Sequence, residues 1–130
     1  MFTRIAFYLI FYPLSIIPLC LLYLIAIPLY LILGFVFGYR KKIIDKNLKN
    51  SFPEFDARMI KKISNKFYWH LTQLGIEMLK MISMSRKNVM RRYHCSNPEV
   101  VNKFFDEGKS VILTSSHYNN WEWMVLSLDM

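Results

Sequence analysis

The sequence predicts an α/β fold in which an amino-terminal membrane helix is followed by helices and the start of an incomplete sheet. Three observations support this prediction. Residues 5–39 carry no charged side chain, residues 56–83 have a long helical pattern, and strand-like, helical and strand-like patterns succeed one another within residues 93–114. Alternation of strands with helices is typical of βαβ units. We therefore expect a membrane anchor at 1–39, a basic juxtamembrane linker at 40–55 and a partial cytoplasmic domain at 56–130.

The uncharged segment 5–39 is long enough to cross a bilayer, which takes about 20 apolar residues. Its three prolines, Pro13, Pro18 and Pro28, are expected to kink or break it. We predict a spanning helix at about 5–27 and an interfacial segment at 28–39. A re-entrant hairpin that never crosses is the alternative. The run exceeds the apolar core of roughly 7 to 15 residues found in cleaved signal peptides.

The formal net charge is +8, which suits nucleic acid, an anionic membrane surface or an acidic partner. The long uncharged segment favours the membrane over nucleic acid. Only Arg4 precedes this segment, whereas several cations follow it closely, so the positive-inside rule places the remainder in the cytoplasm. The side chains that we consider as contacts for anionic lipid or an acidic protein, against the simpler interpretation of a solvated surface, are Arg40, Lys41, Lys42, Lys61, Lys62, Lys66, Arg91 and Arg92.

Three helices are predicted in the second part of the chain. Asp56 is a suitable N-cap for a helix that ends near Ser83. A shorter helix is expected at 85–92, and another at 98–107, with Gly108 as its terminator. The apolar stripe expected to be buried along the first helix consists of Ile60, Ile63, Phe67, Leu71, Leu74, Met78 and Ile82.

A histidine and an acid follow the strand-like run 111–114. In a regular helix, His117 and Glu122 would be rotated by about 140° from each other and could not readily touch. If His117 lies in a loop and Glu122 in the first turn of the next helix, the carboxylate can fold back onto the imidazole. One ring nitrogen would then be fixed and the other free to accept a proton from a hydroxyl. This spacing predicts a general base without a protein nucleophile.

The segment HYNNWE resembles the HX4D/E signature of the lysophospholipid-acyltransferase-like superfamily, and its flanks, GKSVILTSSH and WEW, are most similar to the lipid A biosynthesis acyltransferase family. The resemblance implies that His117 is the base, that Glu122 supports it, and that Asn120 and Trp121 match the family's Asn-Trp pair. Asn119 departs from the pattern, in which glycine is common. A second similarity lies in the linker and consists of Arg40, Asn47, Leu48, Phe52 and Pro53.

The resemblance further implies an O-acyltransferase at the cytoplasmic side of a bacterial inner membrane. An acyl-acyl carrier protein would be the donor and a hydroxyl of a lipid A precursor the acceptor. The sequence has no glycine-rich phosphate loop and no zinc-ligand spacing, so we expect no cofactor and no metal. The alternatives are another lipid acceptor or a non-catalytic protein that binds anionic lipid. Because the resemblance covers only the amino-terminal part of the family's length, we expect a truncated product that is inactive alone.

Overall fold

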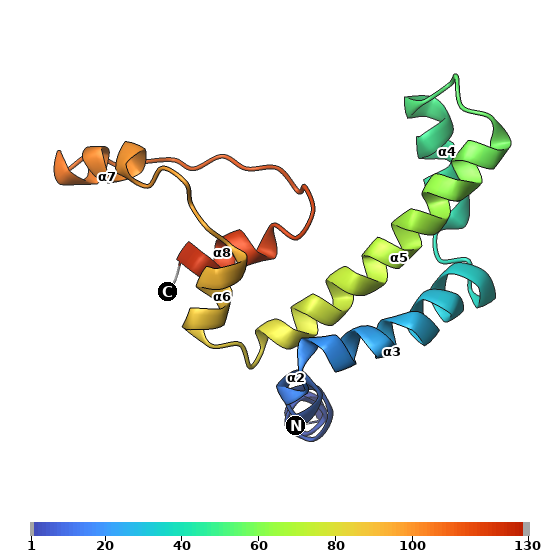
Figure 1. Cartoon of the computed structure of the whole chain (residues 1–130), viewed down its shortest axis with the longest axis horizontal. Helices are drawn as coiled ribbons and strands as arrows, with labels where there is room; N and C mark the ends of the chain where they lie inside the picture. The colour runs from blue at the N-terminus through green and yellow to red at the C-terminus, as the bar shows by residue number, and fades with distance from the viewer. Residues whose placement is uncertain (1, 129–130) are drawn as a thin grey trace. The chain divides into compact units, whose positions relative to one another are not determined.

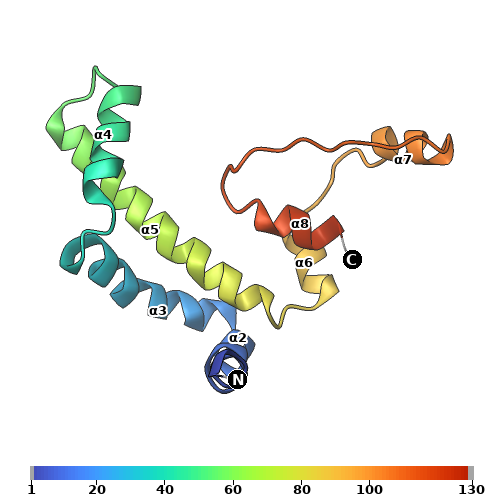
Figure 2. The same cartoon turned by 180° about the vertical axis from the view of Figure 1, so that it is seen from behind.

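The computed structural model describes residues 2–128, which form two compact units, Met1–Ser83 and Met84–Met130. Figure 1 shows the helices in chain order, and Figure 2 shows them from behind. Each unit is helical, and the described residues include no β-strand. The helical part of the prediction is therefore confirmed, while the start of a sheet is not.

The apolar segment is divided differently from the prediction. Helical structure stops at Ile17 and Pro18, whose ψ angles are 136° and 139°. It resumes at Leu19 and continues through Pro28 without a break. Proline disfavours helical geometry at the residue before it, which accounts for the extended Ile17. The helix predicted at 5–27 is thus two helical stretches. They comprise α1 (Phe2–Ala6), the π-helical η1 (Phe7–Phe11) and α2 (Tyr12–Ile16), followed by α3 (Leu19–Leu31) and the π-helical η2 (Ile32–Val36).

The second stretch is the part of the described chain that could cross a membrane by length and composition. It covers the 18 residues Leu19–Val36, and 17% of this window is buried inside the protein. The first stretch, Thr3–Ile16, is apolar but shorter.

Two helices follow the apolar segment. The linker forms α4 (Lys41–Ser51), and α5 (Ala57–Met81) is the longest helix. The carboxylate of Asp56 accepts a hydrogen bond of 2.7 Å from the backbone N–H of Met59. Such a bond satisfies one of the amides that an α-helix leaves unpaired at its start. The predicted N-cap and helix are confirmed.

Helix α5 packs against α3 through a different face from the one predicted. The buried positions repeat every four residues and include two hydroxyl side chains, as Ile60, Ser64, Tyr68, Thr72 and Ile76 show. Of the predicted stripe, Ile60 is buried, whereas Phe67, Met78 and Ile82 are exposed. Small side chains at this face let the two helices approach closely. Thr72 remains satisfied because its hydroxyl donates to the backbone carbonyl of Trp69 at 2.7 Å.

The core of this unit lies between α3 and α5. Leu22 and Ala26 of α3 are fully buried against Ile76, which is 4% exposed. Farther along, a Cβ atom at Gly34 would lie 3.3 Å from Cγ of Tyr68, so the missing side chain permits this close contact. The apolar helices are therefore joined to α5 along most of its length.

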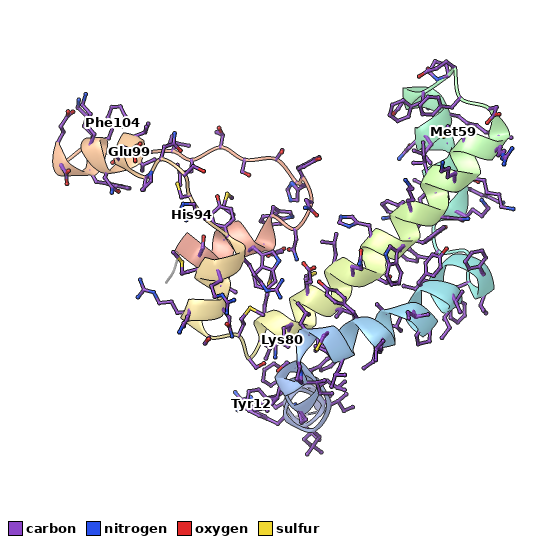
Figure 3. All side chains as sticks on the ribbon, in the orientation of Figure 1. Tyr12, Met59, Lys80, His94, Glu99 and Phe104 are labelled. Atoms are coloured by element: carbon purple, nitrogen blue, oxygen red, sulfur yellow. The ribbon has the colours of Figure 1, made fainter. Side chains whose placement is uncertain are left out.

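Lys80 supplies hydrogen bonds to the backbone at the break between α2 and α3. Its ammonium donates to the backbone carbonyls of Ser15, Ile16 and Ile17 at 2.7, 3.2 and 3.1 Å. The hydroxyl of Ser83 donates to the same Ser15 carbonyl at 2.6 Å. Figure 3 labels Lys80 where the end of α5 meets this junction. Carbonyl groups at a helix end lack partners within the helix, and here Lys80 of α5 and Ser83, just after α5, supply them.

The second unit consists of α6 (Arg86–Arg92), α7 (Glu99–Asp106) and α8 (Glu122–Leu128). Gly108 has φ +68° and ends α7, as predicted. The segments expected to be strands, 93–96 and 111–114, contain no assigned strand. A strand's backbone groups bond to a neighbouring strand, and the described residues provide none.

Candidate active site

The motif residues occupy a loop and the first turn of a helix, as the spacing predicted. Residues 109–118 form neither helix nor strand, a bend follows at Asn119 and Asn120, and Glu122 begins α8. Asn119 has φ +53°, in the left-handed region. Asparagine enters this region more readily than most residues, so it can take the place that glycine has in the family pattern.

The imidazole of His117 lies against an aromatic side chain. The ring centroids of His117 and Trp121 are 4.5 Å apart, with an angle of 66° between the ring planes. His117 is exposed, and Trp121 and Glu122 are partly buried. The contact limits how far the imidazole can turn while leaving it open to a substrate.

His117 and Glu122 are close in sequence but are not bonded to each other. No hydrogen bond or ion pair joins these two described side chains. A base that takes a proton from a hydroxyl needs its imidazole oriented, and hydrogen bonds of this kind often tighten only when substrate is bound. The pairing of His117 with Glu122 therefore stays a prediction, as do the roles of Asn120 and Trp121.

Helix α8, which carries Glu122, is held against α6. Trp123 is 7% exposed and Val89 of α6 is fully buried. The guanidinium carbon of Arg92 lies 5.5 Å from the centroid of the Trp123 ring, within the range of a cation–π contact. The sequence predicts Arg92 as a contact for lipid or carrier protein, whereas in the structure its guanidinium lies over the Trp123 ring. Its neighbour Arg91 is exposed.

Several of the predicted cationic residues meet in the first unit. Lys41 and Lys61 line a cavity of about 430 Å³ between α4, α5 and η2, together with Lys49, Ser64 and Asn65. Lys42, Lys62 and Lys66 are exposed elsewhere on α4 and α5, and Arg40 is exposed just before α4. The cavity thus concentrates positive charge, although Asp45 also lines it and pairs with Lys41 at 2.7 Å.

Two polar atoms near this cavity are buried without a hydrogen-bond partner in the described part of the chain, Oδ1 of Asp45 and Oγ of Ser64. The phenol of Tyr68 at the cavity wall donates to the carbonyl of Tyr39 at 2.8 Å. Burial raises the pKa of this phenol above its usual value, against the opposing effect of the Lys41 ammonium. Tyr68 therefore remains a neutral donor.

The sequence patterns do not indicate that Lys49, Asn65 or Tyr68 belongs to a site. The four-residue spacing of Asp45 and Lys49 on α4, and of Lys61 and Asn65 on α5, places polar groups on one face of each helix. This signal was available, but it gave no reason to pair the two helices. Among the described residues, no three His, Cys, Asp or Glu side chains gather as metal ligands would.

Comparison with known proteins gives one clear match. No curated protein and no solved structure matches the chain significantly. The profile of the family described as bacterial lipid A biosynthesis acyltransferase matches residues 5–130, which is nearly the whole sequence and includes both the linker and the histidine motif. The chain therefore belongs to the bacterial lipid A biosynthesis acyltransferase family.

Proposed function

We propose that the chain acts in the transfer of a fatty acyl group from an acyl carrier protein thioester to a hydroxyl of a lipid A precursor. The observation that carries this proposal is the motif itself, an exposed His117 followed by Glu122 at the start of α8, in a chain of this family. Acyltransferase chemistry of the family supports the class of reaction, and the acceptor and donor are our inference.

The reaction is direct transfer without an acyl-enzyme intermediate. His117 takes the proton of the acceptor hydroxyl as its oxygen attacks the thioester carbonyl, and Glu122 stabilises the imidazolium that forms. The tetrahedral intermediate then collapses, the C–S bond breaks, and the imidazolium returns the proton to the departing thiolate. The products are an ester and the free thiol of the carrier. A positioned base of this kind contributes roughly 10² to 10⁴-fold to the rate.

We place this reaction at the cytoplasmic face of the bacterial inner membrane. The cations that follow the apolar segment, compared with Arg4 alone before it, support that side. The exposed cations on α4 and α5 suit both anionic lipid and an acidic carrier protein. No cofactor is required for the steps described.

The experiment is mass spectrometry of cellular lipids with the complete gene present, deleted, and restored as wild type or as His117→Ala. We expect deletion to remove one acyl chain from lipid A and only the wild-type gene to restore it. If a different lipid class loses a chain, the acyltransferase proposal stands with another acceptor. If no lipid changes, the catalytic proposal fails.

The second candidate function is non-catalytic binding of anionic lipid, which the cavity containing Lys41, Lys49 and Lys61 favours. In that case the His117→Ala variant, expressed in the deletion strain, would restore the wild-type phenotype. A variant with both Lys49 and Lys61 replaced by glutamine would not restore it. The same set of strains therefore separates the two functions.

A further inference from the structure

Helices α3 and α5 run antiparallel and side by side, as both views show (Figures 1 and 2). Contacts between them occur at successive levels. The Tyr23 hydroxyl donates to Oε1 of Glu77 at 2.5 Å, and the rings of Tyr30 and Trp69 meet edge to face with centroids 5.7 Å apart. Tyr68 continues the series at Gly34. Any movement of α3 into a bilayer would therefore take α5 with it.

Helix α5 is poorly suited to the interior of a bilayer. Its stretch without Asp, Glu, Lys or Arg runs only from Phe67 to Ile76, which is about 15 Å at 1.5 Å per residue. The hydrocarbon core is about 30 Å thick. Lys66 and Glu77, at the two ends of this stretch, could not both lie outside it. Each such charge at the centre of a membrane helix disfavours insertion by roughly a hundredfold.

Crossing would also separate the two ends of the helix pair. The loop containing α4 and its lysines lies at one end, and Ser83, which leads to the second unit, lies at the other. If α3 and α5 both crossed, these two basic regions of the chain would be on opposite sides of the membrane. The positive-inside rule places both basic regions on the cytoplasmic side. This placement requires that the pair does not cross.

The surface of the pair is divided into an apolar and a charged side. At about 100° per residue, Phe67, Leu74 and Met78 fall within an arc of about 40° around the axis of α5. Arg58, Lys62 and Lys66 fall in an arc whose centre is about 140° away. Phe67 and Met78 are 42% and 52% exposed, and the uncovered surface of α3 and η2 is apolar throughout, with Leu24 at 61% and Phe35 at 57%.

The break at Ile17 and Pro18 fits the same arrangement. The ammonium of Lys80, with its three carbonyl partners, lies at this break within the apolar segment. An ammonium is stable at the level of the headgroups and not at the centre of a bilayer. The first helical stretch, Thr3–Ile16, leaves the break in a different direction from α3 (Figure 1), and its length of about 21 Å is less than the hydrocarbon thickness.

We propose that the pair formed by α3–η2 and α5 lies in the plane of one leaflet and does not span the membrane. The partner of this surface is a bilayer with anionic headgroups. The apolar side of the pair is immersed at the boundary of the acyl chains, and Arg58, Lys62, Lys66 and the cations of α4 contact the phosphates. The proposal does not depend on acyl transfer.

A depth scan tests the arrangement in vesicles of phosphatidylethanolamine and phosphatidylglycerol. The background carries Cys20→Ser and Cys95→Ser, and single spin-labelled cysteines replace exposed residues along the helix. We expect similar depths at all positions, which share one broad face of the helix, and no trend along the chain. A profile that is deepest near Ala26 and shallow at both ends would show a spanning helix and overturn the proposal, as would labels that all remain in water. The positions are Leu21, Leu24, Ile27, Leu31 and Phe35.

Sidedness gives a second test that needs no activity. Thr3→Cys, Asn50→Cys and Ser96→Cys place single thiols at exposed positions in the same background. We expect a membrane-impermeant maleimide to label none of the three in intact cells and all three after lysis. A difference between any two positions in intact cells would overturn the proposal. Labelling of all three in intact cells would preserve the in-plane arrangement and instead overturn the cytoplasmic location in the proposed function.

Discussion

The two units differ in how they use their apolar side chains. In Met1–Ser83, α3 and α5 cover each other, and Leu22 and Ala26 are fully buried between them. In Met84–Met130, Val89 and Trp123 are buried, but Phe105 and Ile112 are 58% and 89% exposed. A helix completes its hydrogen bonds within itself, whereas an extended segment needs a neighbour. The first unit therefore shows how its helices pack against each other. The second unit shows where the residues of the histidine motif lie, while part of its apolar surface stays exposed.

The largest effect is expected in the second unit, at His117. In the complete protein, replacement by alanine should lower the rate of acyl transfer by about 10² to 10⁴-fold, because the acceptor hydroxyl would have no base. His117 is exposed, so the free energy of unfolding should change by less than about 0.5 kcal/mol. The measurements are single-turnover transfer from acyl carrier protein in membranes and thermal unfolding of the purified protein.

His94→Ala provides the matched control, since His94 is also an exposed histidine of the second unit. It should retain the wild-type rate. Equal losses in the two variants would mean that the rate reports general damage to the unit and not the absence of a base at position 117.

The sequence predicts features that depend on neighbouring residues better than features that depend on distant segments. Asp56, α5 and the end of α7 at Gly108 were predicted because caps and terminators act on the backbone beside them. The buried face of α5 was not, because Ser64 and Thr72 looked polar until a close partner helix was known. A break at Pro18 was expected, but the continuation of α3 through Pro28 was not. The Lys80 side chain that caps the break also comes from a distant segment, which a local pattern does not reveal.

At the candidate site, the sequence predicted positions but not contacts. His117 lies in a loop and Glu122 in a first turn, as expected. The contact of His117 with Trp121 was not foreseen, because two aromatic rings four residues apart can meet in a turn in several ways. The expected sheet also depends on pairing between distant segments, which a local pattern does not specify.

A stability change of intermediate size is expected in the first unit. Leu22→Ala should lower the free energy of unfolding by about 2 to 5 kcal/mol, because it removes fully buried methyl groups and leaves a cavity beside Ile76. The measurement is denaturant unfolding in detergent micelles.

Leu24→Ala makes the same chemical change on the exposed surface of α3, where Leu24 is 61% exposed. In micelles it should alter stability by less than about 0.5 kcal/mol. If the two variants lost equal stability, detergent and not α5 would be the main partner of Leu22, and the comparison between the units would lose its basis.

The smallest effect is expected at the N-cap of α5. Asp56→Ala should cost about 1 kcal/mol, because the backbone N–H of Met59 loses its acceptor. Asp56→Asn keeps a side-chain oxygen and loses only the favourable charge near the helix start, so its cost should be a few tenths of a kcal/mol. Hydrogen exchange of the first-turn amides measures the difference locally. Since the cap is far along α5 from Leu22, the two losses should add, and a marked departure from additivity would mean that the cap and the α3 interface are energetically coupled.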